Sequence, residues 1–184
     1  MNRILSVLLT IISITASNAH AICEVEYTES GDTIAFLDKD YPTRSQRTYH
    51  MKGAKYEPIK DTVDFKQSGQ ASWYGRPFHG RKTASGEVYN MFDYTAAHPT
   101  LPIPSCVKIT NVKNGKTVVV RVNDRGPFKS DLGTDTSNRI IDLSLKAAVA
   151  LDFRNEGIAD VLLEVLPTQL TQKAVVSRMI ASNP

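Results

Sequence analysis

The sequence predicts a mainly β domain: a compact barrel of short strands with one or two short helices. A partly ordered N-terminal extension is expected to precede the barrel. Short β-rich runs separated by glycine and proline turns indicate the strands, and one segment carries a clear helix cap. At 184 residues, with 41% hydrophobic and 22% charged residues, the chain suits one globular domain with extensions. Its net charge of +3 is too mild to indicate a nucleic-acid binder.

The first 21 residues have the pattern of a secretory signal peptide. Arg3 gives a positive start, residues 4–14 are almost entirely apolar, and residues 19–21 form a small-x-small cleavage site. The apolar run is too short to span a bilayer. We therefore expect an exported protein whose mature chain begins at Ile22 and has no transmembrane segment after cleavage.

Two cysteines, Cys23 and Cys106, remain in the mature chain. Export into an oxidising compartment favours a disulfide between them. The alternative is lipid attachment at Cys23, directly after the signal peptide. That reaction requires a small residue before the cysteine, and Ile22 stands there, so the disulfide is the preferred prediction.

Residues 22–66 are expected to form an extension or linker. They are polar, and no regular period persists in them apart from an apolar run at residues 33–37. The barrel domain is expected to occupy residues 67–167, and residues 168–184 are expected to be a short C-terminal tail.

The clearest strands of the domain are two β-rich runs that flank Asn114-Gly115, the strongest short-range signal of a two-residue hairpin turn. The apolar residues of both runs fall on one face, which fixes the register because a one-residue slip would expose them. Counting outward from the turn gives four cross-strand pairs: Ile109 with Val120, Val107 with Val122, Thr110 with Val119, and Lys108 with Arg121.

Two consequences of this count concern charged residues. Asp124 falls on the valine face at the end of its strand, which predicts a carboxylate partly withdrawn from water. Lys108 opposite Arg121 is an unfavourable like-charge pair, so we expect strand twist to separate the two cations or an anion to lie near them.

The remaining elements are less regular. A strand is expected at residues 70–75, followed by a glycine-punctuated loop at residues 78–86. A short strand is expected at residues 139–143, and Ser144 then caps a short helix that ends at residue 150 or 151. Residues 159–166 form the last predicted strand.

The motifs of several enzyme classes are missing from the sequence. It has no phosphate-binding glycine loop and no nucleophile elbow, and its histidines lack the spacing of a zinc site. We therefore expect neither a metal nor a cofactor. The candidate titratable residues are Glu87, Asp93, His98, Asp124 and Asp142.

These residues suit cleavage of a glycosidic bond, which needs a proton donor for the leaving oxygen. Burial or a second carboxylate raises the pKa of an aspartate enough to let it hold that proton. The alternative for Asp124 is a hydrogen bond within its own turn, a common role for aspartate.

Five blocks, taken in order, resemble the rare lipoprotein A family of bacterial endolytic peptidoglycan transglycosylases. They lie at residues 71–75, 83–87, 95–98 with 101–102, 121–128 and 140–144. The resemblance implies a six-stranded double-psi β-barrel. It also implies cleavage of MurNAc–GlcNAc bonds with a 1,6-anhydro product, on glycan strands stripped of stem peptides. The implied location is the periplasm, or the outer membrane if Cys23 is acylated.

The resemblance also implies residue roles. Asp124 matches the family's catalytic acid/base, and Glu87 and His98 match its other required positions. Expected substrate contacts are Trp73, Tyr74, Arg121 and Arg125, with core packing as the alternative for the two aromatic residues and a structural ion pair for Arg125.

Two departures from the family stand out. Ile22 interrupts the lipobox, and too few residues follow Leu166 for the glycan-binding SPOR domain that many members carry. Two other functions stay open: a non-catalytic, expansin-like wall-binding barrel, and a glycoside hydrolase that uses Glu87 and Asp124 with water as the acceptor.

Overall fold

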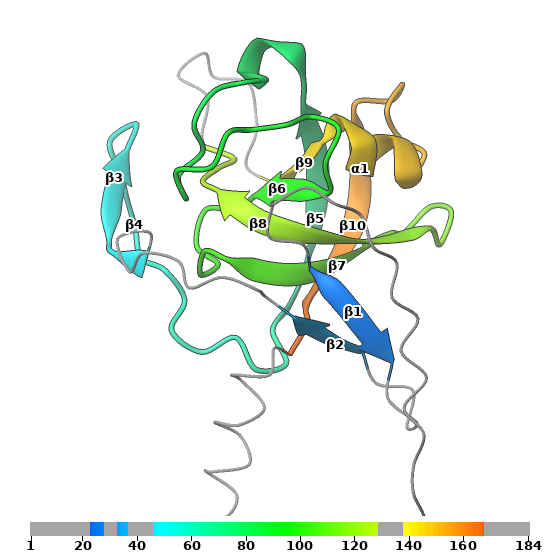
Figure 1. The fold of residues 1–184 in the computed structure, drawn as a ribbon, viewed down its shortest axis with the longest axis horizontal. Helices are drawn as coiled ribbons and strands as arrows, with labels where there is room; N and C mark the ends of the chain where they lie inside the picture. The colour runs from blue at the N-terminus through cyan, green and yellow to red at the C-terminus, as the bar shows by residue number, and fades with distance from the viewer. Residues whose placement is uncertain (1–22, 28–32, 37–45, 129–137, 168–184) are drawn as a thin grey trace, which may run out of the picture.

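The computed structural model describes residues 23–27, 33–36, 46–128 and 138–167, so the predicted signal peptide and C-terminal tail lie outside the described residues. Six strands close into a barrel, which confirms the predicted fold class (Figure 1). They are β5 (Lys66–Tyr74), β6 (Thr95–Ala97), β7 (Ser105–Asn111), β8 (Thr117–Asp124), β9 (Arg139–Ser144) and β10 (Ile158–Val165).

The barrel order is β10-β5-β9-β6-β8-β7, and β7 closes the ring by pairing with β10. Two neighbouring pairs are parallel, β5 with β9 and β6 with β8, and the others are antiparallel. Side chains that alternate along the strands fill the interior, as a small barrel requires. The fully buried ones include Ala71, Ile109, Val122, Ile141, Leu143 and Leu163.

The β7–β8 hairpin has the predicted faces but not the predicted register. Val107 pairs with Val120, and Asn111 is joined to Lys116 by a backbone hydrogen bond of 2.9 Å. The loop therefore has four residues, 112–115, instead of two. The register is displaced by two residues, so the side chains of residues 117–122 keep their predicted faces, and Val120 and Val122 remain inside.

Asparagine side chains explain the longer loop. Asn111 Oδ1 accepts the N–H of Lys113 at 3.0 Å, which starts the turn two residues before Asn114. Asn111 and Asn114 then both donate to the carbonyl of Leu151, at 2.9 and 3.0 Å, and this fixes the loop on the barrel.

The predicted Lys108–Arg121 pair is wrong for the same reason. Arg121 lies opposite Cys106, and Lys108 lies opposite Val119. Each cation instead has its own carboxylate: Lys108 bonds Glu164 at 2.6 Å, and Arg121 bonds Glu87.

The later elements match the sequence closely. β9 and β10 occupy the two predicted strand segments, and Ser144 caps α1 (Leu145–Ala150) by accepting the N–H of Ala147. β5 begins earlier than residue 70, at Lys66, and a short 3-10 helix, η2, spans Arg76–Phe78. β6, with only three residues, was not predicted as a strand.

The described residues of the N-terminal extension include short strands, in keeping with the partly ordered extension that the sequence predicts. It contains two antiparallel hairpins, β1 (Glu24–Tyr27) with β2 (Thr33–Phe36) and β3 (Tyr49–Met51) with β4 (Ala54–Tyr56). The β3–β4 hairpin stands beside the end of β8 (Figure 1). Its Tyr49 and Tyr56 stack on each other and meet the ring of Phe128 edge-on.

Cys23 and Cys106 form a disulfide with an S–S distance of 2.04 Å. The bond links the start of the extension to the start of β7, where both sulfurs pack beside Leu166 and Val119. Among the described residues, no helix is long and apolar enough to cross a membrane.

Candidate active site

Two aspartates, Asp124 at the end of β8 and Asp142 in β9, flank one residue of β6. Ala97 pairs with Asp124 on one side and with Asp142 on the other. Paired residues of neighbouring strands point to the same face, and two strand spacings of about 4.8 Å put their Cα atoms roughly 10 Å apart. The fold thereby brings two carboxylates to one face of the barrel.

A β-bulge turns Asp124 to this face. Ala96 pairs with Val122, but Ala97 pairs with Asp124, so Asn123 is an inserted residue. Without the insertion, Asp124 would share the interior face with Val122. The predicted placement on the valine face is therefore wrong, because simple alternation cannot anticipate an extra residue. Asp124 is nevertheless half-buried, as expected for a strand end.

The carboxyl group of Asp124 is held by the backbone of its own surroundings. Its Oδ1 accepts the N–H groups of Ala84 and Arg125, each at 2.8 Å. Burial raises the pKa of Asp124, and the charge of Asp142 adds to this, although the two hydrogen bonds and the Arg125 guanidinium oppose it. The net effect favours a carboxylic acid that retains its proton at higher pH than a free aspartate.

Asp142 is held from the opposite side. Ser72 donates its hydroxyl to Asp142 Oδ1 at 2.5 Å, and Arg139 donates to Ser72 at 3.2 Å. The other oxygen faces Gly126, because a Cβ atom built on that glycine would lie 3.6 Å from Oδ2. Burial raises the pKa of Asp142, against the Ser72 hydrogen bond.

Gly126 connects the two acids structurally. Its φ of +135° is a conformation that other residues rarely adopt, and it lets the chain after Asp124 fold back over Ala97, whose Cβ lies 3.8 Å from a Cβ built at Gly126. The glycine of the Asp-Arg-Gly-Pro sequence thus covers the strand that separates the carboxylates.

Glu87 is bound in an ion pair. Arg121, only 4% exposed, bonds both of its carboxylate oxygens, and Asn123 donates to one of them at 3.0 Å. These bonds tie the loop at residues 83–87 to the outer face of β8. The same loop supplies the Ala84 N–H that holds Asp124, so Glu87 acts on the site through the loop.

His98 is a buried, neutral histidine with both ring nitrogens engaged. Nδ1 accepts the N–H groups of Thr100 and Leu101 at 3.1 and 3.0 Å, so the ring proton lies on Nε2, which donates to Gln67 at 3.1 Å. Burial, with the charge of Arg125, lowers the pKa of His98 to about 3. Its backbone N–H donates to the Asp124 carbonyl at 3.1 Å. This arrangement positions the end of β8.

Arg125 links the end of β8 to the segment after β6 and to the β3–β4 hairpin. Its guanidinium donates to the carbonyls of His98 and Leu101, at 3.2 and 2.5 Å, and lies 5.5 Å from the ring centroid of Tyr49. Tyr49 in turn donates to the carbonyl of Pro99 at 2.7 Å. The β3–β4 hairpin is therefore fastened directly to the residue that follows Asp124.

The two candidate aromatic residues separate to opposite faces of β5. Trp73 pairs with Leu143, packs against the core and donates its indole N–H to the backbone carbonyl of Arg154 at 3.1 Å. Tyr74 lies on the face of Asp142 and stacks on Tyr89 with ring centroids 4.2 Å apart. Burial raises the pKa of both tyrosines, and the charge of Asp124 adds to this.

The structure thus groups Asp124, Glu87, Arg121 and Tyr74 around the end of β8. His98 contacts the backbone at the same strand end, and Arg125 bonds the carbonyl of His98. Sequence reasoning noted Asp142 as an acid but did not join it to Asp124, and it missed Ser72 and the Ala84 N–H. The signal for Asp142 was its place in a strand, but its neighbour β6 is too short to recognise from sequence.

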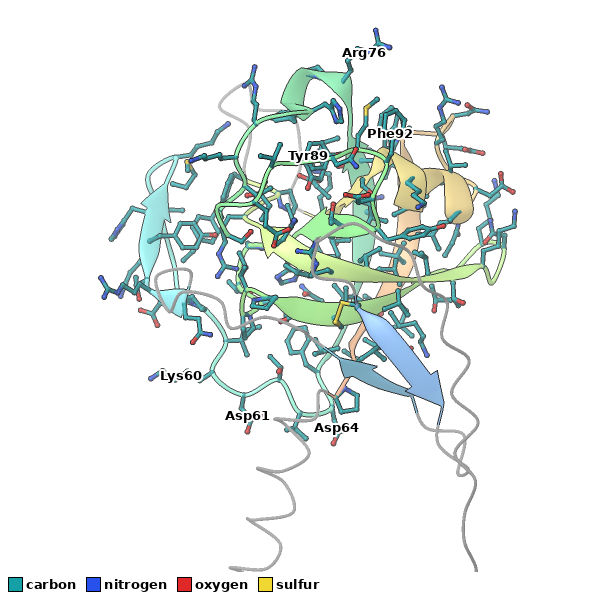
Figure 2. The ribbon with its side chains drawn as sticks, in the orientation of Figure 1. Lys60, Asp61, Asp64, Arg76, Tyr89 and Phe92 are labelled. Atoms are coloured by element: carbon teal, nitrogen blue, oxygen red, sulfur yellow. A yellow bond between two sulfur atoms is a disulfide. The ribbon has the colours of Figure 1, made fainter. Side chains whose placement is uncertain are left out.

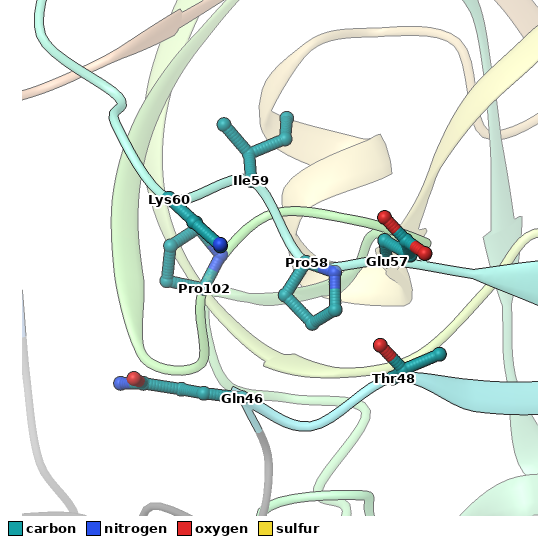
Figure 3. A pocket seen from close by; sticks show the side chains of 7 residues that line it. All are labelled: Gln46, Thr48, Glu57, Pro58, Ile59, Lys60 and Pro102. Atoms are coloured by element: carbon teal, nitrogen blue, oxygen red, sulfur yellow. The ribbon is translucent and has the colours of Figure 1, made fainter.

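Other parts of the described chain offer less chemistry. A pocket of about 560 Å³ lies beside the β3–β4 hairpin (Figure 3), and none of the candidate site residues lines it. Its walls are Gln46, Thr48, Glu57, Pro58, Ile59, Lys60 and Pro102. No cluster of three His, Cys, Asp or Glu side chains suited to a metal ion occurs among the described residues.

The fold and the site define a class of protein: a closed six-stranded β-barrel with two parallel strand pairs and two carboxylates, Asp124 and Asp142, on one face. A family model described as "Lytic transglycolase" matches residues 66–163, more than half of the chain. The chain belongs to this double-psi β-barrel family.

Curated relatives support the same assignment. The "Endolytic peptidoglycan transglycosylase RlpA" of Neisseria meningitidis serogroup A is 50% identical over 143 residues, which cover 77% of this chain and 56% of the relative. The protein of that name from Vibrio cholerae is 49% identical over 126 residues, covering 68% and 45%. The chain therefore spans about half the length of these relatives.

Among solved structures, the chain is similar to the Streptomyces papain inhibitor. The TM-score is 0.44 at 21% sequence identity, and the match covers 58% of this chain and 99% of the inhibitor.

Proposed function

We propose that this protein is an endolytic peptidoglycan lytic transglycosylase that cleaves MurNAc–GlcNAc bonds and leaves a 1,6-anhydro end. The observation that carries the proposal is the half-buried Asp124, whose pKa burial raises, on a face shared with Asp142. The names of the relatives, at about 50% identity, give the substrate class. Glycan strands without stem peptides are the proposed form of the substrate.

Asp124 supplies the proton in this proposal. The acid donates to the glycosidic oxygen as that bond breaks, and positive charge develops on the MurNAc ring. The C6 hydroxyl of the same ring attacks C1, and the ionised Asp124 accepts the hydroxyl proton. The proton given to the leaving group is thereby recovered, and because the C6 hydroxyl is the nucleophile, the reaction needs no activated water and no second nucleophile.

Glu87 and His98 are proposed as positioning residues. Glu87 fixes the loop whose Ala84 N–H holds Asp124, and His98 fixes the backbone on the other side of that residue. The ion pair of Glu87 with Arg121 supports this role over that of a second acid, as the hydrolase alternative would require. We also propose that the chain works outside the cytoplasm, where the Cys23–Cys106 disulfide is stable.

Mass spectrometry of the digestion products tests the proposed reaction. Full-length protein incubated with glycan strands denuded by an amidase is expected to release fragments with 1,6-anhydro-MurNAc ends. Fragments with reducing MurNAc ends would instead identify a hydrolase. Undigested glycan that sediments with the protein would identify a wall-binding barrel, and either outcome would contradict the proposal.

Asp142→Asn tests the coupling of the two acids. The charge of Asp142 raises the pKa of Asp124, so its removal is expected to move the alkaline limb of the kcat/KM profile to lower pH. The profile is measured on denuded glycan between pH 4 and 9, the range that spans the titration of a perturbed aspartate. Glu156→Gln, at an exposed position, is the control. An unmoved limb would show that Asp142 does not influence the reacting acid.

A further inference from the structure

The loop at residues 76–92 is a compact, internally bonded structure at one end of the barrel. Gly80 donates to the Tyr89 carbonyl at 2.9 Å, Tyr89 donates to the Arg81 carbonyl at 2.8 Å, and Lys82 pairs with Val88. His79 accepts the N–H of Met91 at 3.2 Å. These bonds make the loop a built surface on which side chains have fixed places.

This loop and the two residues that follow it expose three aromatic rings. Phe78 is 49% exposed, Phe92 56% and Tyr94 42%. We call these three residues the aromatic platform. Phe92 meets the His79 ring at 5.8 Å, and Phe78 meets Tyr74 at the same distance. Figure 2 shows Phe92 and Tyr89 at this end of the molecule. Grouped exposed rings of this kind mark binding surfaces more often than isolated ones do.

Cations surround the aromatic platform. The Arg81 guanidinium lies 5.8 Å from the Phe78 ring centroid, and the Lys146 ammonium lies 4.4 Å from that of Tyr94. Arg76 and Lys82 are exposed on the same loop. None of these four cations takes part in an ion pair recorded among the described residues, so their charge faces solvent.

Phe78 joins the aromatic platform to the candidate active site. Phe78 packs on Tyr74, which stacks on Tyr89. The charge of Asp124 contributes to the raised pKa of both tyrosines. On the cationic side, Lys82 lies two residues along the chain from Ala84, whose N–H bonds Asp124. These contacts put Phe78 and Lys82 beside the residues that hold Asp124.

We propose that the aromatic platform and its cations bind the glycan strand beside the cleavage point and select strands that carry free lactyl carboxylates. The proposal rests on the proposed function for the identity of the polymer. Aromatic faces pack against the apolar faces of sugar rings, and exposed Arg and Lys attract carboxylates.

The chemistry of the substrate explains the selection. In intact peptidoglycan the lactyl carboxyl of MurNAc is bound in an amide with the stem peptide. Removal of the peptide leaves one carboxylate on every second sugar. The cations beside the aromatic platform therefore find a carboxylate partner only on denuded strands. On intact strands, the bulky stem peptide would also cover the aromatic rings.

Binding without cleavage tests this. Full-length protein carrying Asp124→Asn is titrated with three ligands: denuded glycan strands, intact peptidoglycan, and chitin oligosaccharides, which lack the lactyl group. Adding the pair Phe78→Ala and Phe92→Ala is expected to weaken the binding of denuded glycan by about tenfold, and the binding of chitin oligosaccharides by the same factor. Adding Arg81→Gln with Lys82→Gln is expected to weaken binding of denuded glycan alone and to reduce its salt dependence.

Matched controls lie on the tip of the β7–β8 hairpin. Val112→Ala removes an exposed apolar side chain, and Lys113→Gln removes an exposed cation; neither is expected to change binding. Thermal unfolding of every variant identifies those that fail to fold. Equal binding by the phenylalanine variant and its parent, or no binding by the parent, overturns the proposal.

The two proposals fail separately. If the native chain cuts denuded glycan but the phenylalanine variant binds it as tightly as the parent does, the aromatic platform is wrong and the enzyme assignment stands. If the native chain cuts nothing while binding still depends on Phe78 and Phe92, the aromatic platform stands and the enzyme assignment fails.

Discussion

Replacement of Asp124 by asparagine is expected to lower turnover of denuded glycan by about 10²–10⁴-fold, the contribution of a well-placed general acid. The amide keeps the size and the Oδ1 acceptor that bonds Ala84 and Arg125, so the strand end is expected to fold normally. It cannot donate a proton as an acid does. The loss is therefore expected in kcat, with little change in affinity for the glycan.

Release of anhydro ends from denuded glycan measures this loss, and thermal unfolding verifies the fold. Asp160→Asn, at an exposed position on β10, is the matched control and is expected to retain full activity. An Asp124→Asn variant that releases fragments at the native rate would remove Asp124 from the mechanism and turn attention to Asp142.

His98 is expected to make the fold sensitive to mild acid. Burial lowers the pKa of His98 to about 3 in the folded chain, against about 6.5 when unfolded. Between these values the unfolded chain binds more protons, so the stability that neutral His98 contributes is complete above pH 6.5 and is lost as the pH falls toward 3. The full loss is roughly 4–5 kcal/mol.

Comparison with His98→Gln isolates this effect. The variant loses ring hydrogen bonds, so it is expected to be less stable than the native chain at pH 7 by about 1–3 kcal/mol. The gap is expected to shrink as the pH falls, because only the native chain must bury a neutral imidazole. Free energies of unfolding from urea titrations between pH 7 and pH 4.5 measure it. A gap that stays constant would contradict a buried neutral His98.

The kcat/KM profile of the same variant separates structure from chemistry. A positioning role predicts lower activity with an unmoved pH limb, since the titrating group is Asp124. A limb that moves when His98 is replaced would give the histidine a direct part in proton transfer.

The alternating valines of β8 were sufficient to predict which face is buried, because burial depends on parity and parity survived the two-residue displacement of the hairpin. They were not sufficient to predict loop length. Asn114-Gly115 is a strong local signal, yet the side chain of Asn111 accepts the N–H of Lys113 and also donates to the carbonyl of the distant Leu151. A contact with a residue 40 positions away leaves no trace in the turn itself.

The site was predicted in the same uneven way. The position of Asp124 at a strand end and its partial burial follow from local sequence. Its neighbour Asp142 does not, because the two meet only through Ala97, in a three-residue strand with parallel pairing on one side. The bulge at Asn123 that sets the direction of Asp124 is equally a property of the pairing.

The resemblance supplied residue identities, and the contacts gave them different tasks. Glu87, His98 and Asp124 appear alike as required residues, yet one is ion-paired, one is neutral and enclosed, and one is a half-buried acid. Arg121 and Arg125 also separate, since the first bonds a carboxylate and the second bonds carbonyls. Such differences depend on neighbours distant in sequence.

The disulfide between Cys23 and Cys106 has a consequence for the integrity of the chain. It joins residues 83 positions apart, and the β3–β4 hairpin, the aromatic platform and the Ala84 loop all lie between them. A protease that cuts the backbone once anywhere in that interval therefore produces two fragments that remain one covalent molecule. Nicked protein migrates as a single band on a gel without reductant and as two bands after reduction.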